Sequence, residues 1–235
     1  MHGIRSRRAV VGVGMNIKFP IAGLTAIIAA AGLAACGSDT SDSATAAPAA
    51  STQAAKPLAE IPSLTGRTTA VALDAGFVKA LGTLKLTPGT VGDAELTKAG
   101  SLVFPITGGN VKYYKPGTVS PYVQGEIDHE GSGLSLTGAG KKVELTDFVI
   151  DPGKSVLTGN VSVDGKEAAT GAPLFFLDGR TLEPLKANDN GTAVLEGTTV
   201  KLKQEAADLL NQTFGTDALK AGLVIGVAKI TVNTA

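Results

Sequence analysis

The sequence predicts a mainly β domain, an antiparallel β-sandwich or barrel that also carries two short helices. Short segments with alternating apolar residues recur along residues 63–235, separated by Gly, Pro and Asn turns, a pattern typical of all-β folds. Trp is absent and aromatic residues make up 4% of the chain, so the core must consist mostly of Val, Leu, Ile and Ala. The segment has the length of one domain of this class.

The first elements of this domain are a strand and a helix. In the strand expected over residues 68–73, Val71 and Leu73 lie on one face. Asp74 is expected to cap the helix, because a short polar side chain there accepts hydrogen bonds from the free amides of the first turn. The apolar face of the helix is expected to comprise Phe77, Val78 and Leu81.

Turn residues divide the next stretch into further strands. Thr87-Pro88-Gly89 and Asp151-Pro152-Gly153 are expected turns, and Asp164-Gly165 and Asn190-Gly191 are two-residue hairpin signals. Strands are expected at residues 91–97, 101–106, 119–127, 134–136, 143–150, 157–163, 173–177, 192–195, 198–202 and 223–232.

Two of these strands have special features. The apolar residues of the strand over 143–150 change phase between Leu145 and Phe148, so a β-bulge is expected near Asp147. Residues 173–177 are apolar throughout, which predicts a strand that is buried on both faces.

A second helix is expected over residues 204–214, and Gly215 should end it. Spacings of three and four residues place its apolar residues on one stripe. That stripe consists of Ala206, Leu209, Leu210 and Phe214.

The two ends of the domain also resemble each other. Thr69, Val71, Leu73 and Leu81 recur at constant spacing as Thr198, Val200, Leu202 and Leu210. Gly92-x-Ala94-x-Leu96-Thr97 likewise recurs as Gly226-x-Ala228-x-Ile230-Thr231. The matches indicate a duplicated strand-helix-strand unit, with convergence of two similar units as the alternative.

The charge balance argues against a nucleic-acid partner. The chain has 21 basic and 21 acidic residues, but residues 1–35 hold four of the basic ones and none of the acidic ones. The remaining chain has 17 basic and 21 acidic residues, a net charge of −4. Affinity for nucleic acids comes largely from cations that neutralise phosphates, so an acidic chain does not favour such partners.

The N-terminal segment has the organisation of an export signal. Basic residues precede a run of apolar and small residues from Phe19 to Ala35, which ends at Cys36, the one cysteine of the sequence. Met15 is a second candidate for the start of this segment. A transmembrane helix is the alternative, but the run has only the minimum length for spanning a bilayer and Pro20 interrupts it.

The residues Leu33-Ala34-Ala35-Cys36 resemble the lipobox of bacterial lipoprotein precursors. This resemblance implies cleavage before Cys36, a lipid on its sulfur, and a place on the outer face of the bacterial cytoplasmic membrane. The residues that follow are rich in Ser, Thr, Ala and Pro and predict a flexible spacer. The expected organisation is a signal peptide over residues 1–35, a lipidated tether over 36–62, and one domain over 63–235.

Motifs for catalysis are nearly absent after Cys36. His129 is the one histidine there, and no Gly-x-Ser-x-Gly elbow supplies a nucleophile for a Ser-His-Asp arrangement. No glycine-rich loop opens a helix as phosphate sites require, and one cysteine cannot build a cysteine-based metal site. We expect a protein that is not an enzyme and binds a small ligand or a surface partner. The alternative is a secreted hydrolase that acts on cell-wall or extracellular polymers through carboxylates.

His129 and three tyrosines are the candidate ligand-binding residues. His129 has the strand parity of Ile127, so it should point inward, either to contact a ligand or to serve as a buried structural histidine. Tyr113, Tyr114 and Tyr122 lie nearby in the sequence, and they either line a pocket with His129 or pack on the sheet surface.

Two stretches of the domain resemble the haem-transport-associated (HtaA-type) domain of exported actinobacterial proteins. They read Phe104-Pro105-Ile106-Thr107-Gly108-Gly109 and Gly125-x-Ile127-x-His129-x-Gly131-x-Gly133-Leu134-x-Leu136, and the resemblance extends over most of residues 65–232. It implies a β-rich surface module that binds haem in some members through tyrosine and histidine. His129 is the candidate that matches by motif position. Haem is therefore the candidate cofactor, with His129 and one of the three tyrosines as its expected axial donors.

Overall fold

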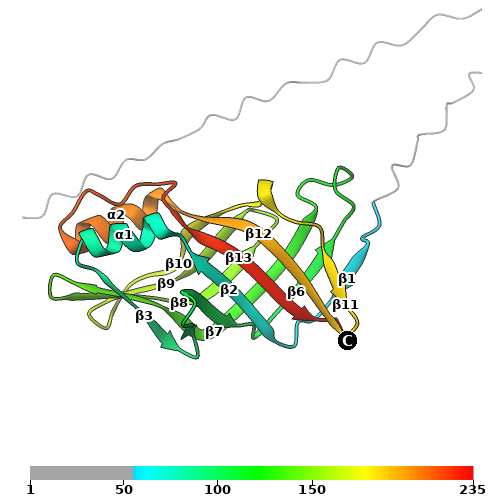
Figure 1. Ribbon diagram of the computed structural model, residues 1–235, viewed down its shortest axis with the longest axis horizontal. Coiled ribbons are helices and arrows are strands. Elements are labelled where there is room, and N and C mark those ends of the chain that lie inside the picture. The colour runs from blue at the N-terminus through cyan, green and yellow to red at the C-terminus, as the bar shows by residue number, and fades with distance from the viewer. Residues whose placement is uncertain (1–54, 235) are drawn as a thin grey trace, which may run out of the picture. The chain divides into compact units, whose positions relative to one another are not determined.

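One curled antiparallel sheet forms the domain. The computed structural model describes residues 55–234; Cys36, the expected signal peptide and most of the expected tether lie outside them. Thirteen strands and two α-helices make up the described part of the chain, and the sheet curls into a half-barrel (Figure 1). The predicted fold class, mainly β with two short helices, is confirmed.

The strands follow one another across the sheet in an order that differs from the chain order. They are β1 (Ala59–Ile61), β2 (Arg67–Leu73), β3 (Thr87–Gly92), β4 (Glu95–Leu96), β5 (Ser101–Pro105), β6 (Gly108–Tyr113), β7 (Val123–Gly138), β8 (Lys141–Asp151), β9 (Val156–Val163), β10 (Lys166–Asp178), β11 (Lys186–Asn188), β12 (Thr192–Leu202) and β13 (Val224–Asn233). Helix α1 (Ala75–Thr83) follows β2, and α2 (Gln204–Phe214) follows β12. The order across the sheet is β1-β6-β7-β8-β9-β10-β12-β13-β2-β5-β4, with β3 on β7 and β11 on β12.

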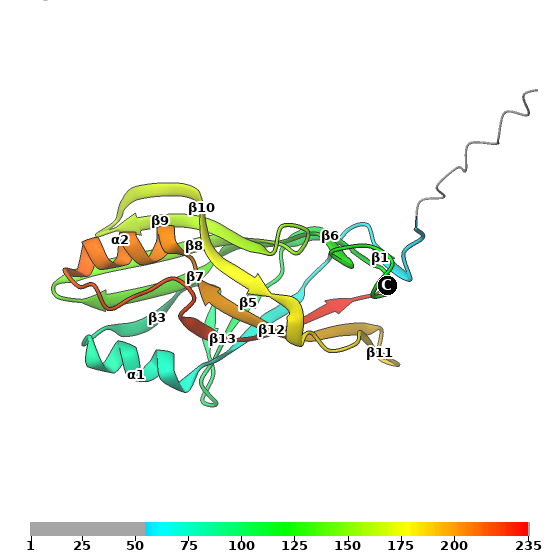
Figure 2. The ribbon, with the colours of Figure 1, turned by 90° about the horizontal axis from the view of Figure 1, so that it is seen from above.

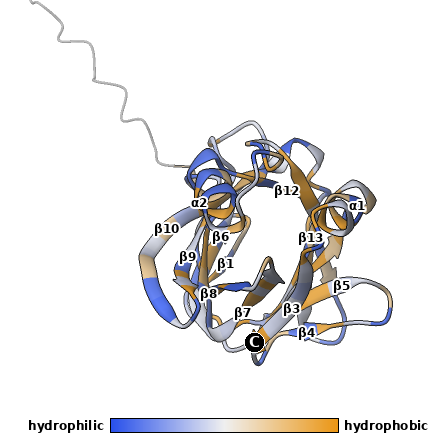
Figure 3. Ribbon diagram, turned by 90° about the vertical axis from the view of Figure 1, so that its left-hand side faces the viewer, coloured by the Kyte–Doolittle hydropathy of each residue, from blue (hydrophilic) through white to orange (hydrophobic). Residues whose placement is uncertain are grey.

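The connection between β5 and β6 draws the two sides of the curled sheet together. The amide of Ile106 donates a hydrogen bond to the carbonyl of Arg67 on β2, and the amide of Thr107 donates to that of Asp128 on β7. Strand β7 pairs with β6 along its first half and with β3 along its second half. Seen from the helix end, β12, β13 and β5 lie across from β7, β8 and β9 (Figure 3).

Both helices lie at the same end of the sheet (Figure 1). Asp74 caps α1 as predicted, because its carboxylate accepts hydrogen bonds from the amides of Gly76 and Phe77. Helix α2 ends at Gly215, whose φ of 65° lies in the left-handed region that favours glycine.

The predicted apolar face of α1 is wrong in one residue. Val78 is 50% exposed, so the buried residues of α1 are Phe77 and Leu81. In the predicted stripe of α2, Leu209 is partly buried and packs against the core, while the other three residues are fully buried. The buried stripe of α2 is Ala206, Ala207, Leu210 and Phe214.

Two predicted boundaries are corrected near the start of the domain. Ala59–Ile61, expected to belong to the tether, forms β1 because its backbone pairs with β6. Thr87-Pro88-Gly89, expected to be a turn, begins β3. Among the described residues β3 pairs with β7 alone. Pro88, which has no amide hydrogen to donate, is tolerated there because one edge of β3 carries no strand partner.

Four further strand predictions are corrected. Of the segment expected at 119–127, residues 123–127 belong to β7, which also contains the segment expected at 134–136, while 119–122 precede it. The segments expected at 192–195 and 198–202 belong to β12, and bulges absorb the changes of phase in both strands. The expected strand over 91–97 is divided between β3 and β4. The segment over 173–177 is not buried on both faces, since Phe176 is 44% exposed on the outer side.

The bulge and one hairpin are confirmed where the sequence placed them. Asp147 has a φ of 52°, and the β8–β9 register shifts between Thr146 and Val149. Asp164 and Gly165 have φ values of 52° and 75°, the two positive values that a type I′ hairpin requires.

The two repeat units agree in their first half. Each has a strand followed directly by a helix, β2 with α1 and β12 with α2. The strands that follow occupy different places, because β13 lies between β12 and β2 whereas β4 pairs with β5. The matched positions therefore share local structure in the strand and helix and differ in pairing beyond them.

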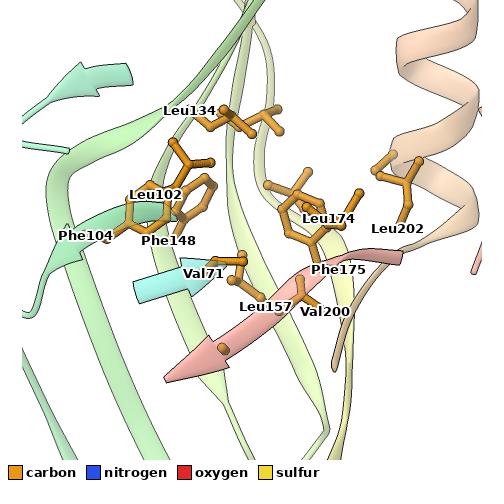
Figure 4. Packing of buried hydrophobic residues seen from close by; sticks show 14 of the residues in the cluster. Val71, Leu102, Phe104, Leu134, Phe148, Leu157, Leu174, Phe175, Val200 and Leu202 are labelled. Carbon is orange, nitrogen blue, oxygen red and sulfur yellow. The ribbon is translucent and has the colours of Figure 1, made fainter. Parts of the chain in front are cut away.

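Apolar side chains from most strands pack into one core. Phe104 and Phe148 meet edge to face with ring centroids 5.3 Å apart, and Phe148 meets Phe175 at 6.5 Å (Figure 4). Leu174 and Leu202 extend this packing towards α2 (Figure 4). Within residues 55–234, no helix is long and apolar enough to cross a membrane.

Candidate ligand-binding site

An apolar pocket lies at the end of the sheet opposite the helices. Its volume is about 350 Å³, and its walls come from β1, β6, β7 and β8 on one side and β11, β12 and β13 on the other. Figures 1 and 2 show β1 and β11 at this end, with the end of β13 between them in Figure 2. Six of the apolar residues that line it are Val111, Ile127, Ile150, Leu195, Ile230 and Val232.

Strand alternation explains why these side chains reach the pocket. Residues two apart on a strand share a face, as Ile230 and Val232 do on β13. On β12 the phase changes at Gly197, where the register shifts, so that Leu195 and Thr198 both line the pocket. The φ of Gly197 is 107°, and a β-carbon there would lie 2.3 Å from the carbonyl oxygen of Thr181, so glycine is required at this bulge.

Tyr113 and Tyr122 lie together on the pocket wall. Their rings meet edge to face at a centroid distance of 5.8 Å and an angle of 90°, and Tyr113 is only 8% exposed. Burial, followed by the nearby Tyr113 hydroxyl, raises the pKa of Tyr122, so its phenol stays protonated. Within the described part of the chain, no hydrogen bond engages either hydroxyl group.

Tyr114 occupies a different position from the other two tyrosines. Its amide donates to the carbonyl of Tyr122 at 2.7 Å, which closes the base of the loop that joins β6 to β7. Tyr114 is not among the residues that line the pocket, since neighbouring residues of an extended chain point to opposite sides.

His129 lies in the apolar core and not on the pocket wall. It is 2% exposed and lines a separate small cavity of about 40 Å³ with Phe104 and Phe148. Its Nδ1–H donates to the carbonyl of Phe148 at 3.1 Å, and its Nε2 accepts from the hydroxyl of Thr69 at 2.8 Å. Burial lowers the pKa of His129 from 6.5 to about 4, so the ring is neutral near pH 7. Both ring nitrogens are engaged within the core.

The structure thus brings together two of the four candidate residues, Tyr113 and Tyr122. The pocket walls from β12, β13 and the segment 179–188 were not identified from the sequence. Apolar residues alternate in this part of the sequence, for example Ala193 and Leu195, but the same alternation also occurs in strands that face a filled core. Only the arrangement of strands distinguishes a core-facing side from a pocket-facing side.

A cluster of charges supports the wall beside β11. The carboxylate of Asp178 is buried at the end of β10 and accepts hydrogen bonds from Nε and Nη2 of Arg180 at 2.9 and 2.6 Å and from Nζ of Lys201 at 2.7 Å. Arg180 and then Lys201 hold the pKa of Asp178 well below its usual value. This network fixes the start of the segment 179–188.

The pocket wall is poor in charged residues. Glu60 is the one carboxylate that lines it, and this side chain forms an ion pair with Lys112 at 3.1 Å. Hydrolysis of glycosidic bonds by carboxylates needs two facing acids roughly 5–9.5 Å apart. Within residues 55–234, no group of three His, Cys, Asp or Glu side chains is placed to hold a metal ion.

No protein-family model matches the chain, and no curated protein matches it in sequence. Two solved structures resemble its fold. The C-terminal domain of HtaA from Corynebacterium glutamicum is 15% identical with a TM-score of 0.49, over 73% of this chain and 98% of that domain. The haem-binding protein HtaB from the same organism is 10% identical with a TM-score of 0.46, over 74% of this chain and 95% of that protein.

Both solved structures are remote in sequence from this chain. Their identities are 15% or less and both TM-scores are below 0.5, so the likeness does not assign a ligand to this chain.

Proposed function

We propose that this protein is a lipid-anchored, extracytoplasmic binding protein, not an enzyme, that holds an apolar small ligand in the pocket at the end of its sheet. The pocket itself carries the proposal. Ligand sites in proteins are typically concave, mostly apolar and supplied with a few polar groups that orient the ligand. The tyrosine pair and Thr198 are polar groups of this kind on a mostly apolar wall.

Haem is the ligand that we propose to test first. The HtaA-type motifs of the sequence support it, and haem iron requires an axial donor such as Tyr or His. The apolar walls suit the body of a tetrapyrrole, and Tyr113 and Tyr122 offer oxygen atoms inside the pocket. Tyr113 is the proposed axial donor, because it is the more deeply buried of the two tyrosines on the pocket wall. His129 would reach the ligand only if the core opened, since both its ring nitrogens are engaged.

A haem titration followed in the Soret band tests this assignment. We expect a Soret shift in the wild type, a shift that is lost or weakened about tenfold or more in Tyr113→Phe, and a shift retained in His129→Gln, in line with the loss of an axial donor. Tyr114→Phe is the matched control, because Tyr114 lies on the same segment but does not line the pocket. The absence of any shift in the wild type would end the haem assignment, and loss of the shift in His129→Gln alone would move the site to the core.

Anchoring rests on a separate part of the chain. The basic and then apolar N-terminal segment that ends at Leu33-Ala34-Ala35-Cys36 supports export and lipidation. These residues precede β1 in the chain, and β1 lines the pocket. The proposed anchor is therefore joined, through the tether, to the strand β1 of the binding site.

A further inference from the structure

Strand β1 is held to the rest of the pocket wall by few hydrogen bonds, as is β11 on the other side. It contains three residues, Ala59–Ile61, and among residues 55–234 it pairs only with β6, since it is an edge strand of the sheet. The amide of Leu58 adds one hydrogen bond to the carbonyl of Tyr113 at 2.7 Å. By contrast, β12 and β13 pair over most of their length and each has partners on both sides.

The two faces of β1 have different environments. Ala59 and Ile61 line the pocket and stand opposite Tyr113 and Val111 of β6. Glu60 stands opposite Lys112 and forms the 3.1 Å ion pair, in which both side chains are 45% exposed. Exposed pairs of this kind contribute little to stability, because water screens the charges and ordering two long side chains costs entropy.

The chain is held firmly just after β1. Leu64 is 3% exposed within the core, and its amide donates to the carbonyl of Gly109 at 2.9 Å. Leu58, on the other side of β1, is 65% exposed. The strand is therefore fixed at its C-terminal side and weakly held at its N-terminal side.

We propose that β1 is a displaceable flap of the pocket, which opens by detaching Ala59–Ile61 from β6 while Leu64 serves as the pivot. This inference rests on the proposed binding function of the same pocket. Displacement removes Ala59 and Ile61 from one wall and exposes Val111 and Tyr113, so ligand gains access at the tyrosine pair. Segments with few buried contacts and few hydrogen bonds open most readily in native proteins.

A reversible disulfide across β1 and β6 tests the flap. Directly opposed residues on antiparallel strands have Cα atoms about 4.5–5.5 Å apart, within the range of about 4.4–6.8 Å that a disulfide spans. The protein from residue 36 onward carries Glu60→Cys and Lys112→Cys, with Cys36→Ser so that no third thiol interferes. The probe is N-phenyl-1-naphthylamine, a neutral dye whose fluorescence rises in apolar surroundings, and its association rate is measured by stopped flow.

We expect oxidation of this variant to slow dye association about tenfold or more, as for other lids that limit access, and reductant to restore it. The matched control is Glu144→Cys with Ser162→Cys, a directly opposed pair on β8 and β9 outside the pocket, whose oxidation should not change the rate. Equal association rates in the oxidised and reduced β1 variant would overturn the flap while leaving the binding function intact. Absence of dye binding in the wild type and reduced protein would overturn the proposed function, and the flap with it.

Hydrogen exchange on the wild type provides a test that needs no disulfide. The flap requires the amide of Leu58 to exchange much faster than that of Leu64, because the first opens with β1 and the second belongs to the pivot. Equal, slow exchange at both amides would rule out a displaceable β1.

Discussion

At the scale of single residues, His129 shows how burial decides the role of a titratable group. The ring lies in the core, donates one hydrogen bond to a carbonyl and accepts one from Thr69. Neutral imidazole offers one donor and one acceptor, so this environment satisfies the neutral ring, while burial away from water disfavours the charged ring. Protonation of His129 therefore opposes folding.

Stability should fall as the pH decreases from 6.5 towards 4. Because the pKa of His129 is lowered to about 4 in the folded protein, the unfolded chain binds the extra proton across this window. The stabilisation is complete above 6.5, falls by about 1.4 kcal/mol per pH unit below it, and amounts to about 3 kcal/mol in total. Urea unfolding at pH 7.5, 5.5 and 4.5 measures this dependence.

The control for this prediction is His129→Gln, which keeps donor and acceptor groups but does not titrate. Its stability should be lower at pH 7.5 and nearly flat down to pH 4.5. Aspartates with lowered pKa, such as Asp178, lose their contribution mainly as the pH falls below the unfolded value of 3.8, and any loss at Glu183 is common to both proteins. An equal slope in both proteins would assign the dependence to other groups.

At the scale of elements, α2 packs its stripe of Ala206, Ala207, Leu210 and Phe214 against β10 and β8. The helix has a glycine cap at its end, and no side chain caps its start. The stability of α2 therefore depends more on tertiary packing than on the capping of its ends, as is usual for short helices.

Leu209 and Leu210 of α2 are the same residue type but differ in burial, so their alanine variants test how much burial contributes to stability. Leu210→Ala should reduce the free energy of unfolding by about 2–5 kcal/mol, because it removes a buried side chain and leaves a cavity. Leu209→Ala should cost roughly half as much or less, since the side chain is only half-buried and part of its surface already faces water. Urea midpoints and m-values of both variants measure the two losses in stability. Equal losses would show that α2 is rotated from the orientation described.

At the scale of the whole domain, the helices lie at one end of the curled sheet (Figure 1). The pocket lies at the other end. The chain leaves the pocket end through β1 and continues towards Cys36. An anchored protein of this design would keep its binding site on the side where the tether begins.

Cys36→Ser should remove the protein from the membrane fraction or leave an unprocessed precursor. Two acyl chains anchor a protein firmly, so a variant that cannot be lipidated should lose this attachment. Fractionation of cells, with immunoblotting of wild type and variant, measures the distribution. Ser38→Ala, just after the lipobox-like residues, is the control and should stay with the membrane; an unchanged membrane fraction of Cys36→Ser would contradict lipidation.

The sequence alone predicted those features that depend on interactions between residues close together in the chain. The bulge at Asp147, the hairpin at Asp164-Gly165 and the cap at Asp74 follow from backbone preferences and short-range hydrogen bonds, so residue types alone predicted them. Alternation likewise predicted that His129 points inward. It did not show whether inward meant core or pocket, since both present apolar faces of the same period.

The tertiary structure decided how distant segments meet. Val78 and Leu209 fit their helical stripes by spacing, but the direction from which each helix docks leaves them partly exposed. Strand β1 looked like tether because three residues carry too little pattern to mark a strand, and only the free edge of β6 orders them. Tyr113 and Tyr122 form one wall because a loop closes between β6 and β7, while His129 is drawn into the core by Thr69, sixty residues away in the chain. The sequence alone therefore determines the β class and several of its turns, whereas non-local strand pairing decides where the pocket lies and which candidates line it.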